Sequence, residues 1–243
     1  MTRNKLIRFA EMANFPNVLQ PDLKIFTINN FTYKGKWNSN FFKNNNPIII
    51  ELGCGKGEYT IGLGEIFQQK NFIGIDIKGA RMYVGAKKAL EKKINNVAFL
   101  RTKIELIEYI FGKDEIDEIW LTFPDPQPKK RWTKKRLTSS YFQNKYRHIL
   151  KNKGIMHLKT DNKFLYYYTL TLLKTNNVNI LYNCEDIHNN NFYEKPELKI
   201  ITYYEQQFIE KGEKIKYICW EKPEKELKEL SDETSKEIEK LYI

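Results

Sequence analysis

The chain of 243 residues is long enough for one α/β domain with additions, or for two small domains. Its 41 Lys and Arg against 30 Asp and Glu give a net charge of +11, which favours a polyanionic partner over a merely solvated lysine surface. Three scattered cysteines and three histidines show no disulfide framework and no metal-ligand spacing. No segment is apolar enough to span a membrane, so we expect a soluble, cytoplasmic protein without a metal.

The predicted elements alternate in type along most of the chain. Residues 1–46 are polar, basic and rich in asparagine, and they predict a partly flexible N-terminal arm. From Pro47 onward, apolar runs of strand length alternate with helical patterns, which is typical of βαβ units with right-handed crossovers. The pattern predicts an α/β fold with a doubly wound, mostly parallel sheet and helices on both faces. The expected strands are Ile48–Leu52, Phe72–Ile75, Val97–Leu100, Ile119–Thr122 and Ile155–Leu158, and the expected helices are Glu58–Gln69, Gly79–Lys92, Ile104–Phe111, Thr138–Leu150 and Asn162–Thr175.

The C-terminal third completes this organisation. Val178–Trp220 has the pattern strand, loop, helix, strand, and we expect it to extend the same sheet. Residues 221–243 are mostly Lys and Glu at helical spacing, and they predict a charged helical tail. The expected organisation is therefore an arm over 1–46, a main domain over 47–220 and a tail over 221–243.

A glycine-rich loop, "ELGCGKGEYT", follows the first strand and opens the first helix. In doubly wound folds, ligands bind at this edge of the sheet. A dinucleotide fingerprint would have glycine at the sixth position, where this chain has Glu58. The acid Glu51, two residues before Gly53, would repel a pyrophosphate but suits the cationic end of S-adenosylmethionine. We therefore favour that cofactor over a nicotinamide dinucleotide, although a turn that needs glycine only for its shape stays possible here.

Asp76 ends the second strand, in "FIGIDIKG". A carboxylate at this place can accept hydrogen bonds from both hydroxyls of a ribose. Together with the glycine loop, it predicts a nucleoside-containing cofactor.

The loop "LTFPDPQPKKRW" follows the fourth strand. Its prolines fix φ and remove backbone donors, so we expect them to hold Asp125 rigidly at the ligand edge of the sheet. The cations that follow, which include Lys129 and Arg136, predict a basic rim, and Trp132 within this run suits nucleic acid better than a plain solvated turn does.

Five stretches together resemble the bacterial tRNA (guanine-N7-)-methyltransferase (TrmB) family. They are "ELGCGKGEYT", "FIGIDIKGARM", "LTFPDPQPKKRWTKKRLT", "HLKTDN" and "ITYYEQQFIEKG", in the family's order and spacing between Pro47 and Trp220. The resemblance implies a Rossmann-like class I methyltransferase fold with a seven-stranded sheet. It also implies S-adenosylmethionine as cofactor, tRNA as partner and methylation of N7 of the variable-loop guanine. We expect no obligatory protein partner, and a monomer or homodimer.

The resemblance also implies roles for individual residues. Glu51, Gly53, Gly55 and Asp76 would bind the cofactor, and Asp125 would contact the cofactor and serve in catalysis. The substrate would be bound by Lys129, Asp161, Thr202, Tyr203, Tyr204 and Glu205.

Two positions depart from the family pattern. Gln127 replaces the usual tryptophan after "PDP", with Trp132 where histidine is more usual. Lys103 stands where an aspartate normally lies near the adenine, so either its backbone amide or Glu105 would take over that contact.

The stretch Thr202-Tyr203-Tyr204-Glu205 also fits a capping box, with Thr202 as the helix N-cap and Glu205 three residues later. The substrate role and the capping role are compatible. The competing functions are methylation of another RNA or of a protein, and a tRNA-binding module without catalysis.

Overall fold

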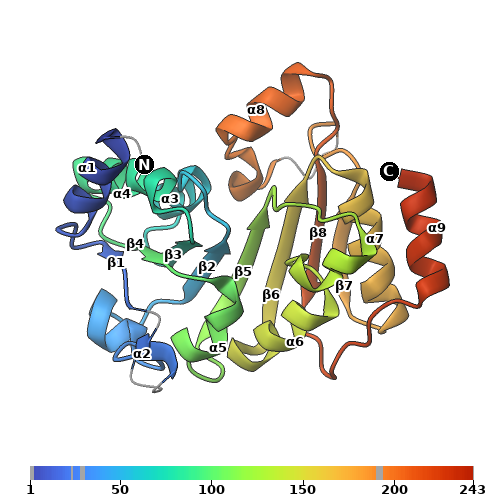
Figure 1. The fold of residues 1–243 in the computed structure, drawn as a ribbon, viewed down its shortest axis with the longest axis horizontal. Coiled ribbons are helices and arrows are strands. Elements are labelled where there is room, and N and C mark those ends of the chain that lie inside the picture. Colours follow the sequence, from blue (N-terminus) through green and yellow to red (C-terminus); the bar gives the residue numbers. More distant parts are fainter. Residues whose placement is uncertain (1–2, 23, 28–30, 190–193, 243) are drawn as a thin grey trace. The chain divides into compact units, whose positions relative to one another are not determined.

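The computed structural model describes residues 3–22, 24–27, 31–189 and 194–242, and they form two compact units, Met1–Ile119 and Trp120–Ile243 (Figure 1). The α/β class predicted from the alternating pattern is confirmed. No helix in the described ranges combines the length and apolarity that crossing a bilayer requires.

Unit 1 is built around parallel strands in the order β1-β4-β3-β2. Its strands are β1 (Val18–Leu19), β2 (Ile48–Leu52), β3 (Asn71–Asp76) and β4 (Val97–Arg101), and its helical segments are α1 (Arg3–Met12), α2 (Lys24–Thr27), α3 (Glu58–Ile66), α4 (Gly79–Glu91) and α5 (Ile107–Ile110), with a π-helical turn at Trp37–Phe42 and a 3₁₀ turn at Ile104–Leu106. All five residues of β2 are buried, as expected for a strand covered on both faces.

The strand β1 is an addition to the seven predicted strands. Eight strands occur in the described part of the chain, and β1 pairs with β4 through Val18 and Leu19 alone. Two residues are too few to produce an alternating pattern, so this strand has no signature in the sequence.

The predicted N-terminal arm contributes to the core of unit 1. Met12 and Trp37 are fully buried, and α1 contacts α4. The Trp37 ring packs against Phe31, Tyr33, Phe41 and Phe111, with centroid distances of 5.4–6.0 Å. Burial of aromatic surface therefore holds these residues of the arm in the core. Residues 1–2, 23 and 28–30 lie outside the described part, and the boundary at residue 46 stays a prediction.

Glu115 fastens the aromatic segment to the rest of unit 1. Its carboxylate accepts hydrogen bonds from the backbone N–H groups of Gly35 (2.9 Å), Trp37 (3.0 Å) and Gly112 (2.7 Å). Hydrogen bonds to an ionised acceptor are stronger than neutral ones. One side chain thus satisfies three donors in two separate segments.

Unit 2 holds β5, β6, β8 and β7 in that order, and the pairs β6–β8 and β7–β8 are antiparallel. The strand β5 (Ile116–Thr122) begins in unit 1 and ends in unit 2. The other strands are β6 (Leu150–Thr160), β7 (Ile180–Cys184) and β8 (Lys216–Glu221), and the helices are α6 (Ser140–Ile149), α7 (Lys163–Thr175), α8 (Tyr203–Glu210) and α9 (Asp232–Tyr242), with 3₁₀ turns at Lys130–Lys135 and Pro196–Lys199.

The charged C-terminal tail is helical only from Asp232 onward. The residues before it have no regular secondary structure, and amide side chains of α6 and of the turn after α7 hold them. Asn144 binds both the N–H and the carbonyl of Leu227, and Asn176 does the same for Lys228. The helix α9 then packs against α7, where the rings of Tyr167 and Tyr242 stack at 4.0 Å (Figure 1).

Glu115→Ala should lower the free energy of unfolding by about 2–4 kcal/mol, because three backbone donors lose a charged acceptor. Urea denaturation measures this change. Glu91→Ala on the exposed face of α4 is the matched control and should change stability by less than about 0.5 kcal/mol. Equal stability of the two variants would contradict the role of Glu115.

Candidate functional site

The glycine loop of unit 1 turns sharply between β2 and α3. Gly53, Gly55 and Gly57 all have positive φ, of 81°, 55° and 72°. The loop folds back over the end of β3, where the N–H groups of Gly53 and Cys54 both donate to the carbonyl of Ile75, at 2.8 and 3.1 Å. The turn therefore needs glycine for its backbone conformation.

The space around two of these glycines differs. A Cβ on Gly57 would lie 2.5 Å from the ring of Phe99, so Gly57 is required for packing as well as for its backbone angle. A Cβ on Gly55 would meet nothing within 4 Å. The Gly55 backbone thus borders open space at the carboxyl ends of the strands of unit 1, where a ligand can approach it closely.

Glu51 of β2 is 3% exposed, and its side chain reaches the start of α3. Its carboxylate accepts hydrogen bonds from the Thr60 backbone N–H at 2.9 Å and from the Thr60 hydroxyl. A negative charge is favourable near a helix N-terminus, which accounts for a carboxylate at this depth.

Asp76 connects the glycine loop to the end of β3. One carboxylate oxygen accepts from the Gly55 N–H at 2.9 Å, and the other accepts from the Lys78 N–H at 2.7 Å. A carboxylate has about four acceptor positions, so each oxygen can accept a further hydrogen bond from a ligand. The structure thus brings Glu51, Gly53, Gly55 and Asp76 to one edge of unit 1.

Lys103 lies at this same edge. It lies two residues after the end of β4 and is exposed, and the N–H of its neighbour Thr102 donates to the Asp76 carbonyl at 3.1 Å. Lys103 therefore lies next to the end of the strand that carries Asp76. Its contact with an adenine stays a prediction.

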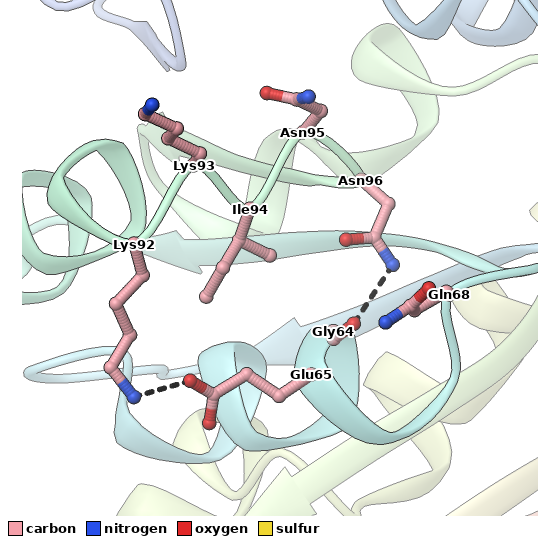
Figure 2. Close-up of a pocket in the computed structure, with 8 residues that line it drawn as sticks. All are labelled: Gly64, Glu65, Gln68, Lys92, Lys93, Ile94, Asn95 and Asn96. Atoms are coloured by element: carbon pink, nitrogen blue, oxygen red, sulfur yellow. Dashed lines mark hydrogen bonds and ion pairs between the residues drawn. The ribbon is translucent and has the colours of Figure 1, made fainter.

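A separate hollow of about 550 Å³ lies at the opposite edge of unit 1 (Figure 2). It is lined by the end of α3 and by the turn that leads from α4 into β4. The ion pair of Lys92 with Glu65 and the hydrogen bond from Asn96 to the Gly64 carbonyl border it. Because it lies at the amino ends of β3 and β4, it is not where a sheet of this kind binds a cofactor.

In unit 2, the proline-rich loop leaves β5 beside the end of β6. The Phe123 N–H donates to the Lys159 carbonyl at 2.8 Å. Phe123 and Gln127 have positive φ, of 48° and 46°, which is uncommon for residues other than glycine. Asp125 and Lys129 are exposed on this loop.

The basic run that follows forms a 3₁₀ turn around Trp132. The charged ends of Lys129, Arg131 and Lys135 lie 5.3, 5.1 and 6.0 Å from a ring centroid of Trp132. Lys130 forms an exposed ion pair with Asp232 of α9 at 2.5 Å. The rim is thus partly occupied by contacts within unit 2.

Arg136 does not belong to this rim, contrary to the sequence-based expectation. Its side chain is 1% exposed, and its guanidinium donates to the carbonyls of Gln127 (2.8 Å) and Pro128 (2.7 Å). A planar group with five donors can hold two carbonyls at once, which explains why this arginine turns inward.

Three segments of unit 2 meet at the ends of β5 and β6 (Figure 1). The ring of Phe123 stacks on Phe208 of α8 with centroids 5.8 Å apart. The Lys159 ammonium forms an ion pair with Glu205 at 2.8 Å and donates to the Leu198 and Ile200 carbonyls at 3.1 and 3.0 Å. The loop of Asp125, the strand end of Asp161 and the start of α8 are thereby held together.

The pair of Lys159 and Glu205 is fully buried, with both side chains 0% exposed. Burial lowers the pKa of Lys159 and raises the pKa of Glu205, and each partner opposes the other's shift. His188 lies 3.4 Å from the same carboxylate. Glu205 therefore cannot reach a substrate from the surface, and its predicted role in binding would be exerted through α8.

The N-cap predicted at Thr202 is confirmed, since its hydroxyl accepts from the Glu205 N–H at 3.2 Å. Tyr203 and Tyr204, which follow, are 50% and 38% exposed. The helix start thus presents two aromatic rings outward while Glu205 anchors it from inside.

Asp161 lies just beyond β6, half-buried. Burial raises the pKa of its carboxyl, and Glu213 adds to that shift, while a backbone hydrogen bond and Lys216 oppose it. The Lys216 ammonium, 2% exposed, donates to the backbone carbonyls of Asp161 (2.9 Å) and Lys214 (2.8 Å). The Asp161 backbone is therefore fixed by a cation that sits below it.

Comparison with known proteins gives a consistent assignment. A family model described as a putative methyltransferase matches residues 45–218. The tRNA (guanine-N(7)-)-methyltransferase of Christiangramia forsetii is 54% identical over 89% of this chain and 97% of its own length. The enzyme of the same name from Bacteroides fragilis is 49% identical over 94% of this chain and 90% of its own.

The chain belongs to the tRNA (guanine-N(7)-)-methyltransferase family. The resemblance inferred from the five motifs is thus confirmed. Among solved structures, a 16S rRNA methyltransferase, KamB, matches with a TM-score of 0.58 at 8% identity, covering 78% of this chain and 94% of its own. At that identity the match supports the fold alone.

The inward-facing cations of unit 2 were not predicted from the sequence. Lys159, Lys216 and Arg136 look like ordinary surface charges, yet each is nearly or fully buried. A signal for Lys159 was available, because it directly follows the expected strand Ile155–Leu158 and lies in the part of β6 where every residue is buried. A lysine buried in such a strand needs a carboxylate partner, because an unpaired buried charge is strongly destabilising.

Lys159→Met should lower the free energy of unfolding by about 3–5 kcal/mol, because it leaves the Glu205 carboxylate buried without its cation. The double variant Lys159→Met/Glu205→Leu should recover most of this loss, since it removes both buried charges. Urea denaturation of the three proteins measures the difference. A single variant as stable as the wild type would show that the pair does not hold α8.

Proposed function

We propose that this protein transfers the methyl group of S-adenosylmethionine to N7 of the guanine in the variable loop of tRNA, in the cytoplasm. The observation that carries the proposal is the meeting of three family motifs in unit 2, where the Phe123–Phe208 stack and the Lys159–Glu205 pair join the segments of Asp125, Asp161 and Thr202. Family membership supports the reaction type.

The residues of unit 1 fit the cofactor. Asp76 keeps acceptor positions for ribose hydroxyls, the open space at Gly55 admits a ligand next to the backbone, and Glu51 supplies negative charge for a cationic end group. Lys103 would contribute beside the adenine through its backbone amide. When bound, S-adenosylmethionine supplies a methyl group on a positively charged sulfur.

The acceptor atom needs little activation by the protein. Guanine N7 carries an in-plane lone pair and has no proton to remove, so the protein's task is mainly to position the base. During transfer, positive charge moves from sulfur to the purine ring. Asp125, on the loop between β5 and the basic turn, would stabilise that charge as a fixed carboxylate.

The residues of unit 2 would select and hold the RNA. Asp161 would accept hydrogen bonds from the guanine N1–H or its exocyclic amine, which adenine cannot provide in the same way. Lys129 would contact a phosphate, and the exposed rings of Tyr203 and Tyr204, next to Thr202, would pack against the nucleotide. Binding through lysine and arginine predicts a strong dependence on salt.

Incubation of the protein with total tRNA and methyl-labelled S-adenosylmethionine should place the label on N7 of the variable-loop guanine. Aniline cleavage after reduction maps the modified position, because N7-methylguanosine is the site of strand scission. A transcript with adenine at that position is the control and should take up no label. Undiminished labelling of that transcript, or labelling of ribosomal RNA instead, would refute the proposed substrate. If no methyl group were transferred at all, the remaining function would be that of a tRNA-binding module without catalysis.

Asp161→Asn should lower kcat/KM for tRNA by about tenfold or more, since a hydrogen bond to a charged group is worth about 1.5–3 kcal/mol. The same change should raise the melting temperature at neutral pH. The pKa of Asp161 is raised on folding, so its ionised form opposes folding once the pH passes above the ordinary value of 3.8.

Two measurements check these expectations. The stability gain of Asp161→Asn should be absent below pH 3.8, should grow between pH 3.8 and the folded-state pKa, and should level off above it, as followed by thermal melts. The acid limb of the wild-type rate profile should reflect an apparent pKa above 3.8 and should disappear in the variant. A variant that methylates as well as the wild type would exclude Asp161 from guanine recognition.

A further inference from the structure

Arg136 has a buried guanidinium to which the proposed chemistry gives no role. Its guanidinium is buried inside unit 2, and its strongest contacts are two neutral backbone carbonyls, those of Gln127 and Pro128. The nearest carboxylate, Glu239 of α9, is 3.9 Å away. Burying a charge costs free energy. A buried arginine that donates to backbone carbonyls therefore implies that the positions of those carbonyls matter.

The proline-rich loop that Arg136 contacts can do little to stabilise its own backbone conformation. Pro124, Pro126 and Pro128 have no N–H groups, so this stretch has few backbone donors for hydrogen bonds. Gln127 between them has a φ of 46°, a left-handed conformation that a residue with a side chain adopts only when its surroundings enforce it. The two hydrogen bonds from Arg136 to the carbonyls of residues 127 and 128 supply that enforcement.

Arg136 in turn rests on the helix α7. Its guanidinium lies 4.7 Å from the ring centre of Phe164 and 4.5 Å from that of Tyr168. This helix begins directly after Asp161, with Asn162 as its N-cap. The guanidinium therefore links the loop that carries Asp125 to the helix whose start adjoins Asp161.

We propose that Arg136 is a positioning residue for methyl transfer: it fixes the backbone between Asp125 and Lys129 relative to Asp161. This inference rests on the proposed function. Arg136 is too deeply buried to reach a ligand at the surface, so it acts by setting where the Asp125 carboxylate lies when the base is bound. A misplacement of about 1 Å in such a group can cost about 100-fold in rate.

Arg136→Lys tests the proposal, because lysine keeps the charge but cannot hold two carbonyls in a fixed fork. We expect kcat for tRNA methylation to fall about 10- to 100-fold. The dissociation constant for S-adenosylmethionine and the KM for tRNA should stay within about twofold of the wild type, because neither binding surface is removed. A purely structural role would instead lower the melting temperature and leave kcat of the folded protein unchanged.

Arg147→Lys is the matched control. Arg147 also donates a guanidinium N–H to a backbone carbonyl, that of Glu224 at 3.1 Å, and lies 3.9 Å from the carboxylate of Glu226. It holds the C-terminal segment and not the proline-rich loop, so kcat should be unchanged. An equal loss of kcat in both variants would overturn the proposal, and so would a wild-type kcat in Arg136→Lys.

A second variant keeps the test decisive if Arg136→Lys does not fold. Phe164→Leu retains an apolar side chain but removes one ring from beside the guanidinium. It should lower kcat several-fold without a change in KM, and an unchanged kcat would overturn the proposal. Failure of the wild-type protein to methylate tRNA would instead refute the proposed function.

Discussion

The buried ion pair of Lys159 and Glu205 is the constraint on which the architecture of unit 2 depends. It joins the end of β6 to the start of α8, which are separated by the long segment containing β7. Leaving either charge buried without the other is strongly destabilising, so the pair couples the folding of the two segments. The exposed tyrosines of α8 and the half-buried Asp161 keep their positions because this pair is intact.

Much of the fold could be predicted because its signals are local. The apolar run "PIIIEL", the glycine turn and the proline-rich loop each specify their own backbone conformation. Every expected strand lies within an observed one, although β5 begins at Ile116 and not at Ile119, and β6 begins at Leu150 and not at Ile155. The elements that escaped prediction are defined by distant partners. The strand Val18–Leu19 exists only because it pairs with β4, and the aromatic segment around Trp37 is ordered by Glu115, which lies far along the chain.

The candidate site shows the same division. Glu51, Asp76, Asp125 and Asp161 stand next to strand ends, so topology alone places them at the ligand edge of their own unit. The direction in which a long cation points has no comparable signal. Arg136 was expected beside Lys129 on the surface, yet the rings of Phe164 and Tyr168 and two carbonyls hold it inside. Only the packing of α7 against Arg136 explains why this cation is buried while Lys129 is exposed.

Cys54 gives the glycine loop a further chemical property. It lies 6% exposed between Gly53 and Gly55, and burial, reinforced by Glu51 and Asp76, raises the pKa of its thiol well above the usual value. Thiolates, not thiols, are the strong sulfur nucleophiles. A thiolate close to an activated methyl group would compete with the intended acceptor and would end in an alkylated, inactive protein. If the cofactor binds at this loop as proposed, burial first and the two carboxylates second would protect the thiol from self-alkylation.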